Sequence, residues 1–323
     1  MPVARCTDQE FIGLWRANPS AQQVADILEL DVRAVCARRR AIEKRHGIRL
    51  FSPDHRSPDY MLITSDRVEV KLGITNGVVL VSGDLHFRPK HSVPVMHRAM
   101  CYLAKKLKPY AIVWNGDVAD FPQISRHPSI GWEGYPTVAD ELATINDRSA
   151  EVMKAAPAAK RIWIAGNHDL RFESRLAAVA GEFKNVKGIH LKDHFPEWTP
   201  AWFVTVNEGE QSHTEIRHRE KSGVHAGYNN TKESGVTMVT GHDHRADVVP
   251  YDDRRGRRYG VRHGMGADGP RDPQFVNYLE GKRVNWAAGL AVLTYKNGEL
   301  LCPELALRYG DDSFQFRGEV IKV

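Results

Sequence analysis

Short apolar runs recur through the middle of the chain, and each run ends abruptly at polar residues. In one of them, Ile162–Ala165, the next residues are Gly166, Asn167, His168 and Asp169. An apolar run of this length that stops at a glycine predicts a buried strand followed by a tight turn. A buried strand has no folding reason to finish with an amide, an imidazole and a carboxylate, and all three groups can bind metal or move protons. This turn is therefore a candidate site.

The same arrangement occurs at four further places, where an apolar segment runs into Asp or His. These places are Val78–Val81 before Asp84 and His86, Ala111–Trp114 before Asp117 and Asp120, Val224 before His225, and Val236–Val239 before His242 and His244. A single Asp-x-His is usually a solvated turn, and a single Gly-x-His-x-His is often a loop with a hydrogen-bonded histidine. In open α/β sheets, however, ligands gather beyond the carboxyl ends of the strands. The five strand ends together therefore predict one polar site.

Apolar residues at helical spacing predict three helices near the start of the chain. Thr7 and Glu10 have the spacing of a capping box at the beginning of the first helix. The third helix is expected from about Val32 to His46. It should end at Gly47, because glycine is common just past the C-terminus of a helix.

Several shorter patterns predict the remaining elements. Asn76-Gly77, between the alternating residues 67–72 and the apolar residues 78–81, is a hairpin signal. Residues 254–258 predict an arginine-rich hairpin tip, either a solvated turn or a contact for a phosphate backbone. Further elements are expected as helices at 92–108, 137–155 and 171–183, and as strands at 202–206 and 214–217.

Composition places the chain among ordinary globular proteins. Its 323 residues can hold one large domain with or without a small one, and 42% of them are hydrophobic and 26% charged. The net charge of +5 suits a phosphate-bearing substrate without requiring one. The four scattered cysteines form no Cys-x-x-Cys pair, which indicates reduced thiols. Because there is no signal-peptide pattern and no apolar run of membrane-spanning length, we expect a cytoplasmic protein without a membrane partner.

Taken together, the polar motifs resemble the signature of the calcineurin-like metallophosphoesterases, over roughly residues 76–300. The resemblance is carried by Asp84-x-His86, Gly116-Asp117-x-x-Asp120, Gly166-Asn167-His168-Asp169, His225 and Gly241-His242-x-His244. It implies an α/β fold, a four-layer α-β-β-α sandwich with the site at one rim, here preceded by a small all-α domain. It is nearly silent on the substrate.

The resemblance also implies a pair of divalent metal ions, with Mn²⁺ the first expectation and Fe or Zn as alternatives. Asp117 would bridge the two ions. The other ligands would be Asp84, His86 and His244 for one ion, and Asn167, His225 and His242 for the other. Carboxylate, imidazole and amide ligands in one set suit hard and borderline divalent ions. No cysteine takes part, so a structural zinc site is not expected.

The chemistry implied by the resemblance is attack on phosphorus by a hydroxide shared between the two ions. His168 resembles the general acid that protonates the leaving oxygen, and Asp120 resembles the carboxylate that holds this histidine and favours its imidazolium form. Arg171 would offset charge on the phosphoryl oxygens. Asp169 could bind metal, but we expect it to cap the helix that follows.

The third predicted helix has a basic face, and residues 1–51 resemble a helix-turn-helix domain. The stretch Val35–Phe51 resembles the recognition-helix end of LysR-type regulators. This resemblance would place basic side chains against the phosphates and base edges of a major groove. These side chains are Arg33, Arg38, Arg40, Lys44 and Arg45. The alternative is a small helical cap whose charged face is merely solvated. The expected domains are thus 1–51, a linker 52–66, and a phosphoesterase domain 67–323.

One departure from the family bears on the substrate. In Ser/Thr protein phosphatases an Arg-Gly pair follows the second Asp of Gly-Asp-x-x-Asp, whereas here Phe121-Pro122 follows Asp120. The missing arginine weakens the protein-phosphatase interpretation and leaves a diesterase or nuclease open. Combined with the basic third helix, it supports the hypothesis of a phosphodiesterase or nuclease acting on nucleic acid, DNA more than RNA. Chains resembling this arrangement also occur in phages. The alternatives are a phosphomonoesterase for nucleotides or phosphoproteins, and a DNA-binding protein with a structural or degenerate metal site. The intact motifs argue against the last.

Overall fold

The computed structural model describes residues 6–18, 20–48, 50, 68–126, 134–269 and 283–323. The chain divides into two compact units, Met1–Asp66 and Arg67–Val323. The expected linker, 52–66, lies outside the described residues. Among the helices in the described ranges, none is long and apolar enough to cross a membrane.

The first unit consists of the helices α1 (Asp8–Ala17), α2 (Ala21–Leu28) and α3 (Val32–His46). Both bonds of the predicted capping box are present: the Glu10 N–H donates to Thr7 Oγ1 at 3.2 Å, and the Thr7 N–H donates to Glu10 Oε2 at 2.6 Å. α3 ends, as predicted, at Gly47, which is left-handed with φ 62°. The apolar faces of the helices share one core, with Phe11, Trp15, Val24, Ala25, Val35 and Ile42 among its buried members.

The second unit is built on one continuous hydrogen-bonded sheet with the strand order β14-β13-β12-β10-β2-β3-β4-β5-β6-β7-β9-β8. Strands β2 to β5 run parallel, as do β6, β7 and β9, whereas β10 to β14 pair antiparallel. The strands are β1 (Val68–Leu72), β2 (Gly77–Ser82), β3 (Ala111–Asn115), β4 (Lys160–Ile164), β5 (Thr199–Val206), β6 (Thr214–Arg217), β7 (Thr237–Thr240), β8 (Ala246–Asp253), β9 (Gly256–His263), β10 (Gly289–Lys296), β11 (Glu299–Leu300), β12 (Glu304–Arg308), β13 (Ser313–Phe316) and β14 (Glu319–Lys322).

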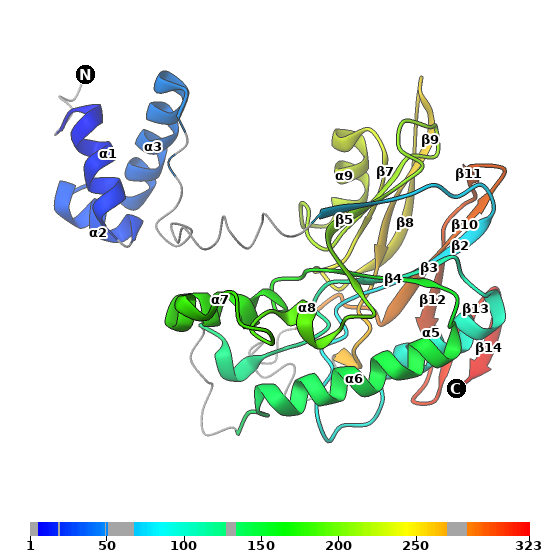
Figure 1. The fold of residues 1–323 in the computed structure, drawn as a ribbon. Coiled ribbons are helices and arrows are strands. Elements are labelled where there is room, and N and C mark those ends of the chain that lie inside the picture. Colours follow the sequence, from blue (N-terminus) through cyan, green and yellow to red (C-terminus); the bar gives the residue numbers. More distant parts are fainter. Residues whose placement is uncertain (1–5, 19, 49, 51–67, 127–133, 270–282) are drawn as a thin grey trace. The chain divides into compact units, whose positions relative to one another are not determined.

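Helices cover the outer faces of this sheet. The helical elements are α5 (Val95–Leu107), η2 (Pro122–Ile124), α6 (Val138–Ala155), α7 (Leu170–Ala180), η3 (Gly181–Phe183), α8 (Leu191–His194) and α9 (Ala226–Ser234). α5 packs against β2, β10, β12 and β13, and α9 packs against β7, β8 and β9 (Figure 1). β10 also contacts β9, and β12 contacts β8, although these strands are far apart in the hydrogen-bonded order. The sheet therefore folds back on itself, and the predicted four-layer α-β-β-α arrangement is confirmed.

Alternation along β2 shows how the sequence builds the two cores. Leu80 belongs to the core shared with the helices α5 and α6, whereas Val79 and Val81 belong to the core between the two halves of the sheet. Because successive side chains of a strand point to opposite faces, a continuously apolar strand must be covered on both faces. All three residues are fully buried. This double burial fixes the carboxyl end of β2, where Asp84 and His86 begin the site.

The hairpin predicted from Asn76-Gly77 is wrong. β1 pairs parallel with β5, with Val70 opposite Val204, while β2 lies between β3 and β10. Both edges of β2 are therefore occupied. The connection between β1 and β2 is fixed by Asn207, whose Oδ1 accepts the Ile74 N–H at 2.7 Å and whose Nδ2 donates to Ile74 O at 3.0 Å.

Candidate metal centre

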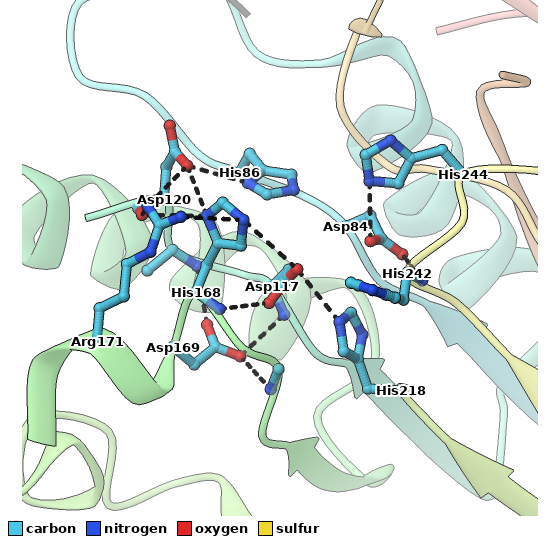
Figure 2. A network of polar contacts seen from close by, with 12 residues as sticks. Asp84, His86, Asp117, Asp120, His168, Asp169, Arg171, His218, His242 and His244 are labelled. Carbon is cyan, nitrogen blue, oxygen red and sulfur yellow. Dashed lines mark hydrogen bonds and ion pairs between the residues drawn. The ribbon is translucent and has the colours of Figure 1, made fainter. Parts of the chain in front are cut away.

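Five loops bring polar side chains together at one rim of the sheet (Figure 2). Each loop follows the carboxyl end of one strand, β2, β3, β4, β6 or β7. Several of these residues are left-handed without being glycine, with φ angles of 52° at Asp84, 40° at His86, 51° at Asp117, 70° at His242 and 57° at His244. Each such conformation costs on the order of 1–3 kcal/mol, and such conformations cluster at functional sites. The strain therefore marks this rim as a candidate site.

Two glycines allow these loops to approach closely. A Cβ atom at Gly166 would lie 2.1 Å from Asp117 Oδ1. Gly116 is left-handed with φ 79°, and a Cβ atom there would lie 2.4 Å from the His218 ring. Any larger residue at either position would displace Asp117 or His218.

The first candidate metal position is formed by Asp84, His86 and His244, whose ligand atoms all lie within 4.8 Å of one another. Asp84 is fully buried, and its Oδ1 lies 3.1 Å from His244 Nε2. Burial disfavours the charged carboxylate, but the facing His244 outweighs burial and holds the pKa of Asp84 below its usual range. A buried anion among imidazoles suits a divalent cation.

The second candidate position is formed by Asp117, His218 and His242. His218 Nε2 lies 3.2 Å from Asp117 Oδ2, and both side chains are 2% exposed. Burial opposes protonation of His218, but the Asp117 carboxylate outweighs burial and raises the pKa of His218 to about 9. Asp117 also groups with His86 and His168. It therefore lies where a carboxylate could bridge the two positions.

Asn167 supplies a further candidate ligand atom. Its Oδ1 is buried and accepts no hydrogen bond from the described residues. Buried polar atoms nearly always have a partner, and a bound cation would provide one. The neighbouring His168 N–H donates to Asp117 Oδ1 at 2.8 Å, so the loop that carries Asn167 is held against the second position. The residues present therefore fit the divalent ions that the resemblance implies.

The prediction of His225 as a ligand is not supported, and His218 lies in its place. His225 is exposed and immediately precedes α9, and it belongs to none of the ligand clusters found among the described residues. The reason is that Val224 is not part of a strand, so no strand end delivers His225 to the rim. His218 directly follows β6, whose predicted range, 214–217, was correct. The same signal, a histidine at a strand end, could therefore have identified it.

His168 lies between a carboxylate and an arginine. Its Nδ1 is 2.8 Å from Asp120 Oδ1, and its Nε2 is 3.3 Å from Arg171 Nη2 (Figure 2). Arg171 Nη1 also donates to the backbone oxygen of Asp120 at 2.7 Å. Burial disfavours the charged imidazolium, but the bond to Asp120 and the charge of Asp117 outweigh it and raise the pKa of His168. A protonated His168 beside the metal positions could act as a general acid.

Asp169 does not cap the helix that follows, contrary to expectation. Its side chain accepts no bond from the first turn of α7. Instead its carboxylate accepts the backbone N–H groups of Asp117, Val118, Ala119 and Gly166 at 2.9–3.1 Å. Asp169 thus ties the loop after β3 to the loop after β4, and it fixes the backbone that carries Asp117.

Glu141 was not anticipated as part of the site. It is fully buried on the inner face of α6, and its Oε1 accepts the N–H of Asp120 at 3.2 Å and of Phe121 at 2.8 Å. Phe121 is left-handed with φ 47°, so Glu141 stabilises a strained turn. Burial raises the pKa of Glu141 to about 7. The sequence contained one sign of its position: Glu141 precedes the core residue Ile145 by four residues, so both lie on the same face of the helix.

Arg262 is a second unanticipated residue, and it supports the loop that carries His242 and His244. It is 4% exposed, and its Nη1 donates to Asp243 Oδ2 at 2.8 Å while its Nε donates to Asp247 Oδ1 at 2.9 Å. Because Asp243 lies between the two histidines, this buried arginine limits the positions both can take.

The basic side chains predicted on α3 are not equivalent. Arg33, Arg40 and Lys44 are exposed. The Arg38 guanidinium lies 5.1 Å from the Phe11 ring centroid, and Arg45 forms an ion pair with Asp8 at 2.6 Å. These last two therefore have partners inside the helical unit.

The basic tip between β8 and β9 is partly neutralised by its own strands. Arg257 pairs with Asp252 at 2.9 Å, and Asp253 pairs with Arg258 at 2.5 Å and with Arg255 at 3.4 Å. The geometry favours the solvated turn over a phosphate contact.

A match to a protein family agrees with this geometry. The family model described as calcineurin-like phosphoesterase matches residues 77–265. The gene 54 proteins of Mycobacterium phages D29 and L5 are each 25% identical over 213 residues, which cover 61% of this chain and 81% of each relative. Among solved structures, Vps29 of Entamoeba histolytica complexed with zinc has a TM-score of 0.40 at 13% identity, covering 76% of this chain and 98% of Vps29. Nuclease MPE of Pseudomonas putida has a TM-score of 0.31 at 10% identity, covering 76% and 87%.

The family match spans more than half of the chain and includes every strand end from Asp84 to His244 that carries a candidate ligand. Divalent metals are the cofactors of this family, and the clusters at the rim offer the ligands that they need. The chain therefore belongs to the calcineurin-like phosphoesterases and is a metal-dependent hydrolase of phosphate esters.

Proposed function

We propose that this chain is a phosphodiesterase that cuts nucleic acid at a centre of two divalent metal ions. The observation that carries the diester assignment is the residue after Asp120. Phe121 is fully buried there and packs against Phe172, with ring centroids 5.7 Å apart. The position that carries a phosphate-gripping arginine in Ser/Thr protein phosphatases therefore contributes no charge here.

The arginines around Asp120 support the same assignment. Arg171 donates to the backbone oxygen of Asp120 and contacts His168, and Arg88 Nη2 lies 3.4 Å from Asp120 Oδ2. Both guanidinium groups are thus held by Asp120. A phosphate monoester carries nearly two negative charges at neutral pH, whereas a diester phosphate carries one. Because both arginines share Asp120 as a partner, the net charge that they offer to a phosphate is reduced, which suits the singly charged diester.

Two metal positions follow from the clusters. The ligands would be Asp84, His86, His244 and Asp117 for one ion, and Asp117, Asn167, His218 and His242 for the other. When bound, the pair would supply the nucleophile and offset charge on the phosphoryl oxygens. We propose Mn²⁺, with Fe or Zn as alternatives, because the ligands mix carboxylate, amide and imidazole.

The protein's own contribution to the reaction is proton transfer and orientation. His168 would give the proton on Nε2 to the leaving oxygen. Asp120, at 2.8 Å from Nδ1, fixes the ring and stabilises its charged form. Arg171, at 3.3 Å from Nε2, is placed to offset charge on a phosphate bound in front of His168.

The nucleic-acid assignment is supported by charge and by the helical unit. The net charge is +5, and α3 exposes Arg33, Arg40 and Lys44. Resemblance of the unit to a helix-turn-helix domain points to DNA more than RNA. The phage origin of the gene 54 relatives suits nucleic-acid processing.

The test is hydrolysis of bis-para-nitrophenyl phosphate beside para-nitrophenyl phosphate, with Mn²⁺ added, in the wild type and in His168→Ala. We expect strong preference for the diester and a loss of roughly 10²- to 10⁴-fold in the variant, the range typical of general acid catalysis. Metal content should stay unchanged, because His168 is not a proposed ligand. Assays with DNA and RNA oligonucleotides would then identify which kind of nucleic acid is cut.

Preference for the monoester would overturn the diester assignment and redirect the search to nucleotides and phosphoproteins. Wild-type protein that binds metal yet hydrolyses neither ester would favour a DNA-binding protein with a structural metal site.

A further inference from the structure

A basic pocket of about 740 Å³ adjoins the metal centre at His86. Its walls come from the loop before α5, from the first turns of α5, from the middle of α6, and from the segments around Asp268 and Arg308. His86 is the one candidate metal ligand among its lining residues. The basic residues of the lining are Arg88, Lys90, His91, Arg98, Arg148 and Arg308.

The lining carries more positive than negative charge. Its lysine and arginines face three acidic lining residues, Asp147, Asp268 and Asp311. Arg308 lies 2.8 Å from Asp268 and 2.9 Å from Asp311. Counted over the whole lining, one lysine and four arginines face three carboxylates, an excess of two positive charges. This imbalance favours an anionic ligand.

The arginines of the wall are held in place by the fold. Arg98 donates from Nη2 to the backbone oxygen of Asp311 at 3.0 Å, and Arg148 pairs with Glu151 at 3.0 Å while remaining only 16% exposed. The buried Nε groups of Arg98 and Arg148 have no acceptor among the described residues. Partly dehydrated, oriented guanidinium groups bind phosphate more strongly than mobile surface lysines do. Phosphate is therefore the anion that this wall fits.

Arg88 connects the pocket to the proposed proton donor. It lines the pocket, and its Nη2 lies 3.4 Å from the Asp120 carboxylate that holds His168. The rings of His86 and His168 also contact each other edge to face, with centroids 4.7 Å apart (Figure 2). The pocket thus opens on the side of the site where His168 would protonate the leaving oxygen.

We propose that this pocket binds the strand on the leaving-group side of the cut, through a phosphate next to the scissile one. This inference rests on the proposed nuclease function and adds a substrate requirement: a chain of linked nucleotides rather than an isolated diester. A volume of about 740 Å³ is suited to a nucleotide-sized group and is far larger than a single phosphate needs.

The pocket should bind the sugar-phosphate backbone without reading bases. Phe87 is the lining residue with a large aromatic ring, and it is only 1% exposed, so it offers no face on which a base could stack. Contacts from arginine and lysine to phosphate carry no sequence information. Cleavage should therefore vary little with the base on the leaving-group side.

The test compares two double variants that remove the same charge. Lys90→Gln/Arg148→Gln alters the pocket, and Lys105→Gln/Lys106→Gln alters exposed lysines in the last turn of α5 that do not line it. Each is assayed on a single-stranded oligonucleotide of about ten nucleotides and on bis-para-nitrophenyl phosphate, which lacks a neighbouring phosphate.

We expect the pocket variant to raise KM for the oligonucleotide by roughly tenfold at low salt, and to lower the slope of log KM against log salt by about 1. Its kcat/KM for bis-para-nitrophenyl phosphate should equal that of the wild type, which also shows that the variant folds. The control variant should match the wild type on both substrates.

An unchanged oligonucleotide KM in the pocket variant, with the wild type cutting the oligonucleotide, would refute the pocket and leave the nuclease function standing. Equal losses on both substrates would also refute it, because the two residues would then support the metal centre. If added nucleotide monophosphate altered bis-para-nitrophenyl phosphate hydrolysis in the wild type but not in the pocket variant, and oligonucleotide cutting stayed unchanged, the pocket would bind a free nucleotide instead. A wild type that cuts no oligonucleotide would refute the nuclease function itself.

Discussion

The metal centre and the basic face of α3 are both rich in charge, but the fold holds them in different ways. At the metal centre Asp84 and Asp117 are buried on strained, left-handed backbone, and they face histidines at 3.1–3.2 Å. On α3 the side chains of Arg33, Arg40 and Lys44 extend into solvent. Many contacts together fix the side-chain positions at the metal centre, whereas the positions on α3 depend on little more than helix formation.

This difference determines how each region should respond to substitution. Buried charges interact strongly because little solvent screens them, so loss of one residue at the rim should remove most of the function. Exposed charges are screened by salt over about 8–10 Å, and each contributes little. Substitutions on α3 should therefore produce small, salt-dependent changes.

The sharpest test of the metal centre compares two histidines that sequence alone does not separate. His218→Ala should lower kcat/KM for a phosphodiester by at least roughly 100-fold, because it removes a proposed metal ligand that faces Asp117. His225→Ala should leave the rate unchanged, because that side chain is exposed and belongs to no ligand cluster. Metal content, measured by atomic emission, should fall only in His218→Ala. The opposite pattern would restore His225 as the ligand.

A smaller loss is expected at the partner of the proposed acid. Asp120→Asn keeps the shape of the side chain but removes the charge that favours the imidazolium form of His168. We expect kcat to fall by about 10- to 100-fold with the metal content unchanged. KM for bis-para-nitrophenyl phosphate should change little. If the variant instead lost metal, Asp120 would act on His86, whose Nδ1 lies 3.4 Å away, rather than on His168.

The same contrast explains what could be predicted from sequence. The apolar runs before Asp84, Asp117, His168 and His242 predicted strands correctly, because a doubly covered strand must be apolar throughout. The polar residues after these runs then had to meet at one rim. A local pattern with a periodic cause was therefore sufficient for these strands and for the gathering of the polar side chains at their ends, whereas the four-layer fold was implied by the family resemblance.

The residues that sequence missed depend on contacts between distant segments. The Asn76-Gly77 hairpin was wrong because pairing of β2 with β3 and β10 overrides a local turn signal. Glu141 and Arg262 act on loops that are far away along the chain, at Asp120 and at Asp243. Asp169 likewise binds backbone groups of the Asp117 loop instead of its own helix. No periodicity encodes such contacts.

Glu141 also gives a prediction about pH. Its pKa in the folded protein is about 7, above the value near 4.3 of an unfolded glutamate. The stability that comes from the neutral carboxyl is therefore fully present below about pH 4.3 and is lost as pH rises through about 7. Glu141→Gln cannot ionise and keeps an acceptor for the two N–H groups. It should be more stable than the wild type above pH 7, by about 3–4 kcal/mol, with little difference near pH 4.

Thermal unfolding of the metal-free proteins at pH 4.5, 6 and 8 would measure this effect. A gain of about 3–4 kcal/mol corresponds to a rise in Tm of roughly 6–16 °C for a unit of this size. The gain should be largest at pH 8, roughly 60% as large at pH 6 and small at pH 4.5. Glu141→Leu is the matched control, since it removes both the charge and the acceptor and should destabilise at every pH. Equal Tm values of wild type and Glu141→Gln at all three pH values would mean that Glu141 ionises normally.

The smallest effect is expected for substitutions on α3. Measuring DNA binding by these variants decides whether the basic face contacts DNA at all. Arg40→Gln/Lys44→Gln should weaken binding of a 20-base-pair duplex by roughly 3- to 10-fold at low salt. The slope of the logarithm of the binding constant against the logarithm of salt concentration should fall in magnitude by about 1 to 2, because a complex with fewer phosphate contacts releases fewer counterions when it forms. Hydrolysis of bis-para-nitrophenyl phosphate should not change. Lys105→Gln/Lys106→Gln removes the same charge from the other unit and separates a local contact from the effect of net charge. If both double variants weakened DNA binding equally, the basic face of α3 would be a solvated surface, and the helical unit would need another role.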